Sequence, residues 1–223
     1  MKSCKKKFDL NEHICNLFSR HPELEKIRKN IIESLIIISE SQEKGGSLLL
    51  CGNGGSAADC EHIAGELLKS FYLKRSLSET RKESLRAVEG LDLESREKLE
   101  NHIEAGFKVF CLTGHSSLQT AVINDTGGEF IFAQQIEAIG SENDVLMALS
   151  TSGNAENVYL AAAVAKAKGM KVIGLTGRTG GRIMSLCDEI IRVPADVTAD
   201  VQELHLPVYH TICAALESEF FQT

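Results

Sequence analysis

Two short segments rich in glycine and hydroxyl side chains constrain the fold of this chain more than any other feature. They are residues 52–56 (GNGGS) and residues 150–154 (STSGN). Each segment follows an apolar, strand-like run and precedes a helix-like stretch. A loop of small residues at such a turn lets the backbone approach a ligand, and it directs N–H groups and hydroxyls at an anion near the helix N-terminus. The two loops together predict one phosphorylated small molecule held from two sides.

The rest of the chain alternates between apolar runs of strand length and stretches of helical periodicity, which is typical of a parallel sheet covered on both faces. We therefore predict an α/β fold, a doubly wound parallel sheet flanked by helices, in a single domain over residues 1–223. Ligands bind at the carboxyl ends of the strands in such sheets. The expected strands are 46–52, 108–113, 144–149, 171–176 and 188–193.

Two segments lie outside this alternation. Residues 8–43 predict two N-terminal helices, with Pro22 in the first turn of the second helix. Residues 77–106 are dense in charge but carry leucines at helical spacing, so we expect a helical insertion that lies on the surface of the domain. Its position, directly after the helix that carries His62 and Glu66, predicts that it packs near a subunit interface and covers an active site.

Composition and charge exclude several classes of protein. A net charge of −7 argues against nucleic acid as a partner, and the run 5–7 (KKK) fits a solvated tail. No segment approaches the roughly 18 apolar residues of a membrane span, and no apolar stretch follows the N-terminal lysines as in a secretory signal. The seven cysteines are scattered and form no C-x-x-C pair. Reduced thiols in a cytoplasmic protein are the expectation.

The loop at 52–56 does not fit the common nucleotide-binding motifs. A Walker A loop ends in Gly-Lys-Ser/Thr, and this loop has no lysine. A dinucleotide fingerprint also requires an acidic residue about 20 positions later at the end of a second strand, and residues 71–79 do not read as a strand. Neither loop contains Arg or Lys. Neutral donors and helix dipoles suit a sugar phosphate, so we expect no nucleotide cofactor.

Candidate acid–base groups lie on two helices. His62 and Glu66 are four residues apart and so share one helix face. Gln202, His205 and His210 cluster on the last helix, although one of the two histidines is expected to be a bystander. A neutral imidazole beside a carboxylate is a common arrangement for moving a proton near pH 7. The set His62, Glu66, Gln202 and His210 could instead bind zinc, but its spacing is not that of a standard zinc motif.

The combined motifs resemble those of the phosphoheptose isomerases, the sedoheptulose-7-phosphate isomerases of the sugar isomerase (SIS) domain superfamily. The resemblance covers the chain except for the charged stretch around 77–106. It rests on 52–56 followed by Asp59, His62 and Glu66, on Asn124-Asp125, on 150–154, on 169–171 (GMK), and on Gln202-Glu203 with His210.

The resemblance implies a homotetramer with active sites between subunits. It also implies isomerisation of D-sedoheptulose 7-phosphate to D-glycero-D-manno-heptose 7-phosphate through an enediol, a step of bacterial heptose biosynthesis. Glu66 and His210 match the catalytic residues of the family, and some members carry zinc on residues matching His62, Glu66, Gln202 and His210. The implied substrate and phosphate binders are Asn53, Gly54, Gly55, Ser56, Asp125, Ser150, Thr151, Ser152, Asn154 and Gln202.

Three departures from the family pattern bear on the substrate. Ala155 stands where a serine usually follows Ser-Gly-Asn, Asp200 stands where a basic residue is common, and the insertion at 77–106 is unusually long. An isomerase of another sugar phosphate therefore stays an alternative. A second alternative is a non-enzymatic SIS-domain adaptor that binds the replication initiator DnaA. In that relative the catalytic glutamate and histidine are replaced, whereas this chain has both.

Overall fold

The computed structural model describes residues 11–221, and a five-stranded sheet forms their centre. All of its strand pairs are parallel, in the order β2-β1-β3-β4-β5. The register places Leu48 of β1 opposite Val109 of β2 and Val145 of β3. The strands are β1 (Leu48–Cys51), β2 (Val109–Cys111), β3 (Val145–Ser150), β4 (Lys171–Thr176) and β5 (Glu189–Arg192).

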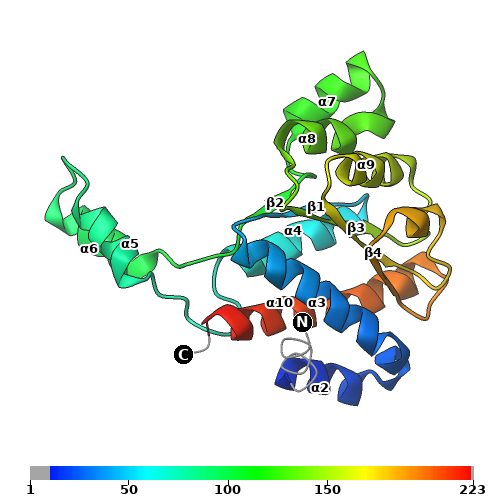
Figure 1. Cartoon of the computed structure of the whole chain (residues 1–223), viewed down its shortest axis with the longest axis horizontal. Helices are drawn as coiled ribbons and strands as arrows, with labels where there is room; N and C mark the ends of the chain where they lie inside the picture. Colours follow the sequence, from blue (N-terminus) through cyan, green and yellow to red (C-terminus); the bar gives the residue numbers. More distant parts are fainter. Residues whose placement is uncertain (1–10, 222–223) are drawn as a thin grey trace.

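Helices cover both faces of this sheet, as the sequence predicts. Side chains alternate across β1, because Leu48 and Leu50 belong to one buried apolar cluster whereas Leu49 and Cys51 belong to another. The first cluster packs under α2, α3, α4 and α10, and the second under α8 and α9 (Figure 1). The helices are α2 (Glu12–Arg20), α3 (Arg28–Glu43), α4 (Gly55–Leu68), α7 (Ser116–Asp125), α8 (Ile131–Ile139), α9 (Glu156–Ala167) and α10 (Thr198–Phe221), with 3-10 turns η1 (Pro22–Ile27), η2 (Gly128–Phe130) and η3 (Arg182–Leu186).

The N-terminal helices differ in one detail from the prediction. Pro22 opens the 3-10 turn η1 instead of the second helix, and α3 begins only at Arg28. The side chain of Asn11 caps α2 by accepting a hydrogen bond from the N–H of His13. Residues 8–10 of the predicted helical region lie outside the described residues.

The insertion is helical but does not lie on the domain surface. Its helices α5 (Glu79–Arg86) and α6 (Leu93–His102) form an arm, residues 76–104, that extends away from the sheet (Figure 1). An antiparallel bridge between Ser76 and Glu104 closes the base of the arm. Neither arm helix has a buried residue, and the apolar side chains of Val88 and Leu93 are exposed.

A buried ion pair joins the end of α4 to the end of α10. Arg75 Nε donates to Glu217 Oε1 at 2.7 Å, and the two side chains are 0% and 1% exposed. The guanidinium also donates to the carbonyl oxygens of Leu67 and Glu66, which are the last turn of α4. The carboxylate of Glu217 accepts hydrogen bonds from three consecutive backbone N–H groups, those of residues 71–73. One ion pair therefore satisfies five backbone groups at the end of α4 and in the connection that follows it.

The described residues bear on two predictions, the absence of a membrane span and the reduced state of the cysteines. Within 11–221 no helix is both long and apolar enough to cross a membrane. The six cysteines in that range are free thiols, and Cys51, Cys60 and Cys213 among them are fully buried. Burial raises the pKa of these three thiols, which fits small core residues and not reactive ones.

The substitution Glu217→Gln is expected to lower the free energy of unfolding by about 3–5 kcal/mol, because it leaves the Arg75 charge buried without a counter-ion. Asp196→Asn provides the control, since the Arg178–Asp196 pair is more than half exposed and is worth less than about 1 kcal/mol. Urea unfolding of both variants at neutral pH measures the difference. Equal losses in the two variants would contradict a special role for Glu217.

The pH dependence of the free energy of unfolding provides a second test of the Arg75–Glu217 ion pair. Burial alone would raise the pKa of Glu217, but the N–H groups of Phe71 and Tyr72 and the Arg75 guanidinium outweigh it and lower the pKa. The pKa of this carboxyl is lower in the folded protein than the value of 4.5 expected in the unfolded chain. The carboxylate therefore stabilises the fold at pH values above 4.5, and this contribution is lost as the pH falls through the pKa of the folded protein. Glu217→Gln should therefore lose less stability on acidification than the wild type.

Candidate active site

The first glycine-rich loop connects β1 to α4. Residues 52–54 form the turn, and Gly54 has a φ of +56°, a conformation that favours glycine. Ser56 lies in the first turn of α4 and is buried. The side-chain amides of Asn53 and Asn157 exchange two hydrogen bonds of 2.8 and 2.9 Å, and Asn157 belongs to α9. This exchange ties the first loop to the helix that the second loop opens.

The second loop connects β3 to α9. Ser150 is buried at the end of β3, and its hydroxyl accepts a hydrogen bond from the N–H of Gly153. Gly153 has a φ of +67°, and a Cβ on it would lie 2.0 Å from the carbonyl oxygen of Gly180. Asn154, an expected substrate binder, is not among the residues that line the cavity described below, and its Oδ1 accepts a hydrogen bond from the N–H of Arg182 at 3.0 Å. At the N-terminus of α9, Ala155 supplies no side-chain cap.

The two loops enclose a cavity of about 300 Å³ at the carboxyl ends of β1 and β3. Its walls offer hydroxyls, two side-chain amides and backbone groups but no Arg or Lys side chain, as predicted for a site that binds phosphate through neutral donors. The lining residues are Asn53, Gly54, Gly55, Ser56, Leu149, Ser150, Thr151, Ser152, Ala155, Thr198 and Gln202. Eight of the residues expected to bind the substrate thus surround one cavity.

Asp125 lies apart from this cavity. It is the last residue of α7, it is exposed, and its Oδ1 accepts a hydrogen bond from the side chain of Asn124 at 2.8 Å. It does not line the cavity between the two loops. A role in the site for Asp125 stays a prediction.

The acid–base candidates of α4 and α10 form one hydrogen-bonded group. His62 Nε2 lies 3.2 Å from Glu66 Oε1 and 3.4 Å from His210 Nε2. The rings of His62 and His210 meet edge to face, with centroids 4.8 Å apart. Burial, and next the charge of His62, lower the pKa of His210, while Glu66 opposes this effect. A neutral imidazole beside a carboxylate can accept and return a proton near neutral pH.

Sequence reasoning missed the part of this group that lies behind His62. Tyr209 Oη is 3.0 Å from His62 Nδ1 and donates to Asp59 Oδ1 at 3.2 Å. Asp59 stands three residues before His62, so helical spacing already places the two on one face of α4. Nothing in the sequence places Tyr209 between them, because it arrives from α10, some 150 residues later.

The other members of the α10 cluster occupy different places. The amide of Gln202 lies over Gly55, where an added Cβ would come within 2.8 Å of three of its side-chain atoms. It therefore belongs to the phosphate cavity and makes no hydrogen bond to His62, Glu66 or His210. His205 is fully buried with both ring nitrogens unpartnered, and burial lowers its pKa to about 4. It is the bystander histidine.

Three of the four expected zinc ligands come together, because His62 Nε2 lies within hydrogen-bond distance of both Glu66 and His210. The fourth, Gln202, faces the phosphate cavity. Among the residues that the structure describes, no group of three or more His, Cys, Asp or Glu side chains could hold a metal ion. Zinc on these residues stays a prediction, and the mechanism below uses none.

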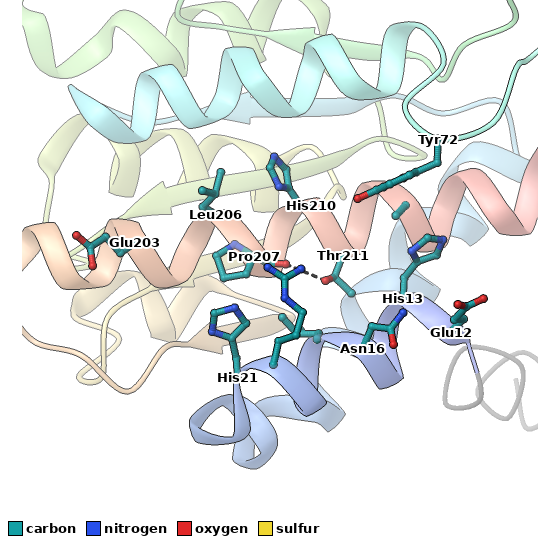
Figure 2. Close-up of a pocket in the computed structure, with 13 residues that line it drawn as sticks. Glu12, His13, Asn16, His21, Tyr72, Glu203, Leu206, Pro207, His210 and Thr211 are labelled. Atoms are coloured by element: carbon teal, nitrogen blue, oxygen red, sulfur yellow. Dashed lines mark hydrogen bonds between the residues drawn. The ribbon is translucent and has the colours of Figure 1, made fainter.

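A larger cavity, about 530 Å³, lies between α2 and α10, and Figure 2 shows His210 beside it. Its walls include His13, Asn16 and His21 from the N-terminal helices and Glu203 from α10. It lacks the glycine-serine loops that direct N–H groups and hydroxyls at an anion. The smaller cavity is therefore the better candidate for the phosphate, with His210 accessible from the larger one.

Comparison with known proteins agrees with this geometry. The SIS domain family matches residues 109–177. Phosphoheptose isomerase from Campylobacter jejuni is 37% identical over 89% of this chain and 91% of its own length, and that from Rhodospirillum rubrum is 40% identical over 84% of each chain. The chain belongs to the phosphoheptose isomerase family. Enzymes of this family are isomerases, which agrees with a site built to move protons.

Solved phosphoheptose isomerases share the fold over most of its length. The enzyme from Neisseria gonorrhoeae superposes with a TM-score of 0.70 at 30% identity, covering 92% of this chain and 95% of that one. The enzyme from Francisella tularensis gives a TM-score of 0.69 at 30% identity, covering 87% and 86%. The doubly wound sheet predicted from the sequence is thus confirmed by the structures of family members.

Gly153→Ala is expected to weaken the binding of a sugar phosphate by at least about tenfold, or about 1.4 kcal/mol. Its Cβ would collide with the Gly180 carbonyl, so the loop must move, and alanine also disfavours a positive φ. The control is Gly65→Ala, because a Cβ at this position of α4 meets no atom within 4 Å and alanine favours the helix. Calorimetric titration with sedoheptulose 7-phosphate compares the two. Unchanged affinity in Gly153→Ala would remove the second loop from the binding site.

Proposed function

We propose that this protein isomerises D-sedoheptulose 7-phosphate to D-glycero-D-manno-heptose 7-phosphate. The observation that carries the proposal is the coexistence of a neutral phosphate cradle with a Glu66–His62–His210 group on the two helices beside it. Membership of the phosphoheptose isomerase family supports the choice of substrate. The reaction belongs to bacterial heptose biosynthesis.

The phosphate is held at the carboxyl ends of β1 and β3. Hydroxyls of Ser56, Ser150, Thr151 and Ser152 and the N-termini of α4 and α9 surround the cavity. These donors are fixed by the loops before the ligand arrives, so binding does not require them to reorganise. Without a lysine or arginine in the cavity wall, the site suits a monophosphate better than a nucleotide.

The sugar chain then extends along α10 toward the proton-transfer group. Gln202 at the phosphate cavity and His210 are eight residues apart, which corresponds to about 12 Å along a helix. A substrate bound by its terminal phosphate must therefore be long to bring its first two carbons to Glu66 and His210. This spacing favours a seven-carbon chain over shorter sugar phosphates.

Glu66 acts as the base that moves a proton between C1 and C2. Its carboxylate takes the proton next to the carbonyl, which leaves an enediol, and returns it to the neighbouring carbon. His210 moves protons among the oxygens and assists ring opening. Its lowered pKa keeps the imidazole neutral near pH 7, so it can serve in both directions.

The adaptor alternative is disfavoured by the same two residues. In the adaptor relative the catalytic glutamate and histidine are replaced, whereas Glu66 and His210 are both present here and both hydrogen-bonded to His62. A binding protein has no need for this arrangement. The other alternative, a different sugar phosphate as substrate, is decided by the assay below.

We expect the wild type to convert sedoheptulose 7-phosphate and the Glu66→Gln variant to lose this activity. Removing a general base lowers kcat by about 10²–10⁴-fold. The control is Glu61→Gln on the same helix, whose side chain accepts a hydrogen bond from Thr113 away from the site. NMR in D2O follows both isomerisation and deuterium incorporation at C2, with ketohexose and ketopentose phosphates in parallel. Faster turnover of a shorter sugar phosphate would overturn the assignment of a heptose substrate. A Glu66→Gln variant that keeps more than about a tenth of the wild-type kcat would exclude Glu66 as the general base.

We also infer a cytoplasmic homotetramer in which the arm of residues 76–104 contacts a neighbouring subunit. The exposed apolar side chains of Val88, Leu93 and Ile103 support this inference, because nothing within the described residues covers them. The shape of the arm in Figure 1 leaves it free to reach beyond its own domain.

Replacing residues 79–102 by a short glycine linker should reduce the oligomer and alter kcat or KM. The deletion keeps Ser76 and Glu104, since these residues form the base of the arm and Glu104 also accepts from the N–H of Ser70 near α4. Light scattering on a sizing column gives the mass, and the heptose assay gives the kinetics. A shortened protein that stays tetrameric with unchanged constants would leave the arm without either role.

A further inference from the structure

A reciprocal pair of hydrogen bonds between Asn53 and Asn157 joins the two sides of the phosphate cavity. Asn53 Nδ2 donates to Asn157 Oδ1 at 2.8 Å, and Asn157 Nδ2 donates to Asn53 Oδ1 at 2.9 Å. Asn53 lies in the first glycine-rich loop, whereas Asn157 lies in the first turn of α9, directly after the second loop. The two residues are 104 positions apart in the sequence, so the pair is a tertiary contact.

The sheet does not hold the two loops together by itself. The register between β1 and β3 ends at the pair Cys51–Ala148, before either loop begins. No backbone hydrogen bond joins residues 52–56 to residues 150–154, and the structure describes all of these residues. The amide pair therefore supplies the hydrogen bonds that link the first loop to the helix opened by the second.

The same pair determines which group of Asn53 is left for a ligand. A side-chain amide has two N–H donors and one acceptor oxygen, and without a partner it can turn to present either end. Asn157 engages the oxygen of Asn53 and one N–H of its Nδ2. The second N–H of Asn53 remains, and Asn53 lines the phosphate cavity. A donor is thus available to an anion, while the oxygen that would repel it is occupied.

We infer that Asn157 is a positioning residue for phosphate binding, which holds the Asn53 amide with its second N–H toward the cavity and fixes the spacing of the two loops. The inference rests on the isomerase function given above. Asn157 is not among the residues that line the cavity, so it acts through Asn53 and does not touch the ligand. A phosphate oxygen accepts the hydrogen bond from Asn53 Nδ2.

This role differs in its consequences from simple support of the fold. Asn53 is exposed and Asn157 is half-buried, so water can replace their lost hydrogen bonds and the stability of the fold changes little. Phosphate affinity changes more, because a side chain that is already held in place loses little conformational entropy when the ligand binds. The phosphate takes no part in the proton transfer, so the effect falls on KM and not on kcat.

Calorimetric titration of the whole chain with inorganic phosphate tests the inference. Asn157→Ala should raise the Kd for inorganic phosphate and the KM for sedoheptulose 7-phosphate about three- to tenfold, with kcat and Tm nearly unchanged. The control is Asn30→Ala, which removes a 2.7 Å hydrogen bond from Asn30 Nδ2 to Glu189. That bond joins α3 to the first residue of β5, at the edge of the sheet opposite to the loops, and its loss should leave Kd and KM unchanged.

The double variant Asn53→Ala/Asn157→Ala shows whether Asn157 acts through Asn53. If it does, the double variant binds phosphate no more weakly than Asn53→Ala alone. The inference is overturned if Asn157→Ala leaves the Kd unchanged, if Asn30→Ala raises it equally, or if the losses of the two single variants add in the double variant. A wild type that binds no phosphate would overturn both this inference and the proposed function. A wild type that binds phosphate but converts no sedoheptulose 7-phosphate would refute the proposed function alone, since the phosphate titrations still decide the role of Asn157.

Discussion

The buried ion pair of Arg75 and Glu217 is the interaction on which the geometry of the site depends. It holds the last turn of α4 against the last turns of α10, and these two helices carry His62, Glu66 and His210. A charge pair of this kind is weak as a source of net stability, because removing both ions from water offsets most of their attraction. Its value lies in geometry, since bonds to carbonyls and N–H groups fix where each helix ends.

The site combines a phosphate-binding region built from neutral dipoles with a proton-transfer region built from titratable side chains. The phosphate loops place neutral dipoles around an anion at the ends of β1 and β3, where backbone glycines allow close approach. The proton-transfer group needs titratable side chains, and it lies farther along α10. A long helix that borders both regions keeps them at a fixed separation, which suits a substrate with its phosphate at one end and its carbonyl at the other.

Partial burial explains how one cluster of ordinary side chains can move protons. Burial lowers the pKa of His210, and His62 lies within hydrogen-bond distance of Tyr209 through one ring nitrogen and of Glu66 and His210 through the other. Burial also raises the pKa of Tyr209, so its hydroxyl keeps the proton that it gives to Asp59. The members of the group are therefore in contact with one another before the substrate binds.

The sequence by itself determined the sheet, its flanking helices and the two loops, because strand burial and strand-to-helix turns depend on local patterns of apolar residues and glycines. It also identified His62 and Glu66, which are neighbours on one helix. Only the tertiary structure decided that Tyr209 stands between Asp59 and His62, that Gln202 faces the phosphate cavity, and that the insertion extends as an arm. The first two are contacts between elements that are distant in the sequence, and the third is the direction in which a helical segment leaves the domain. Local periodicity encodes neither.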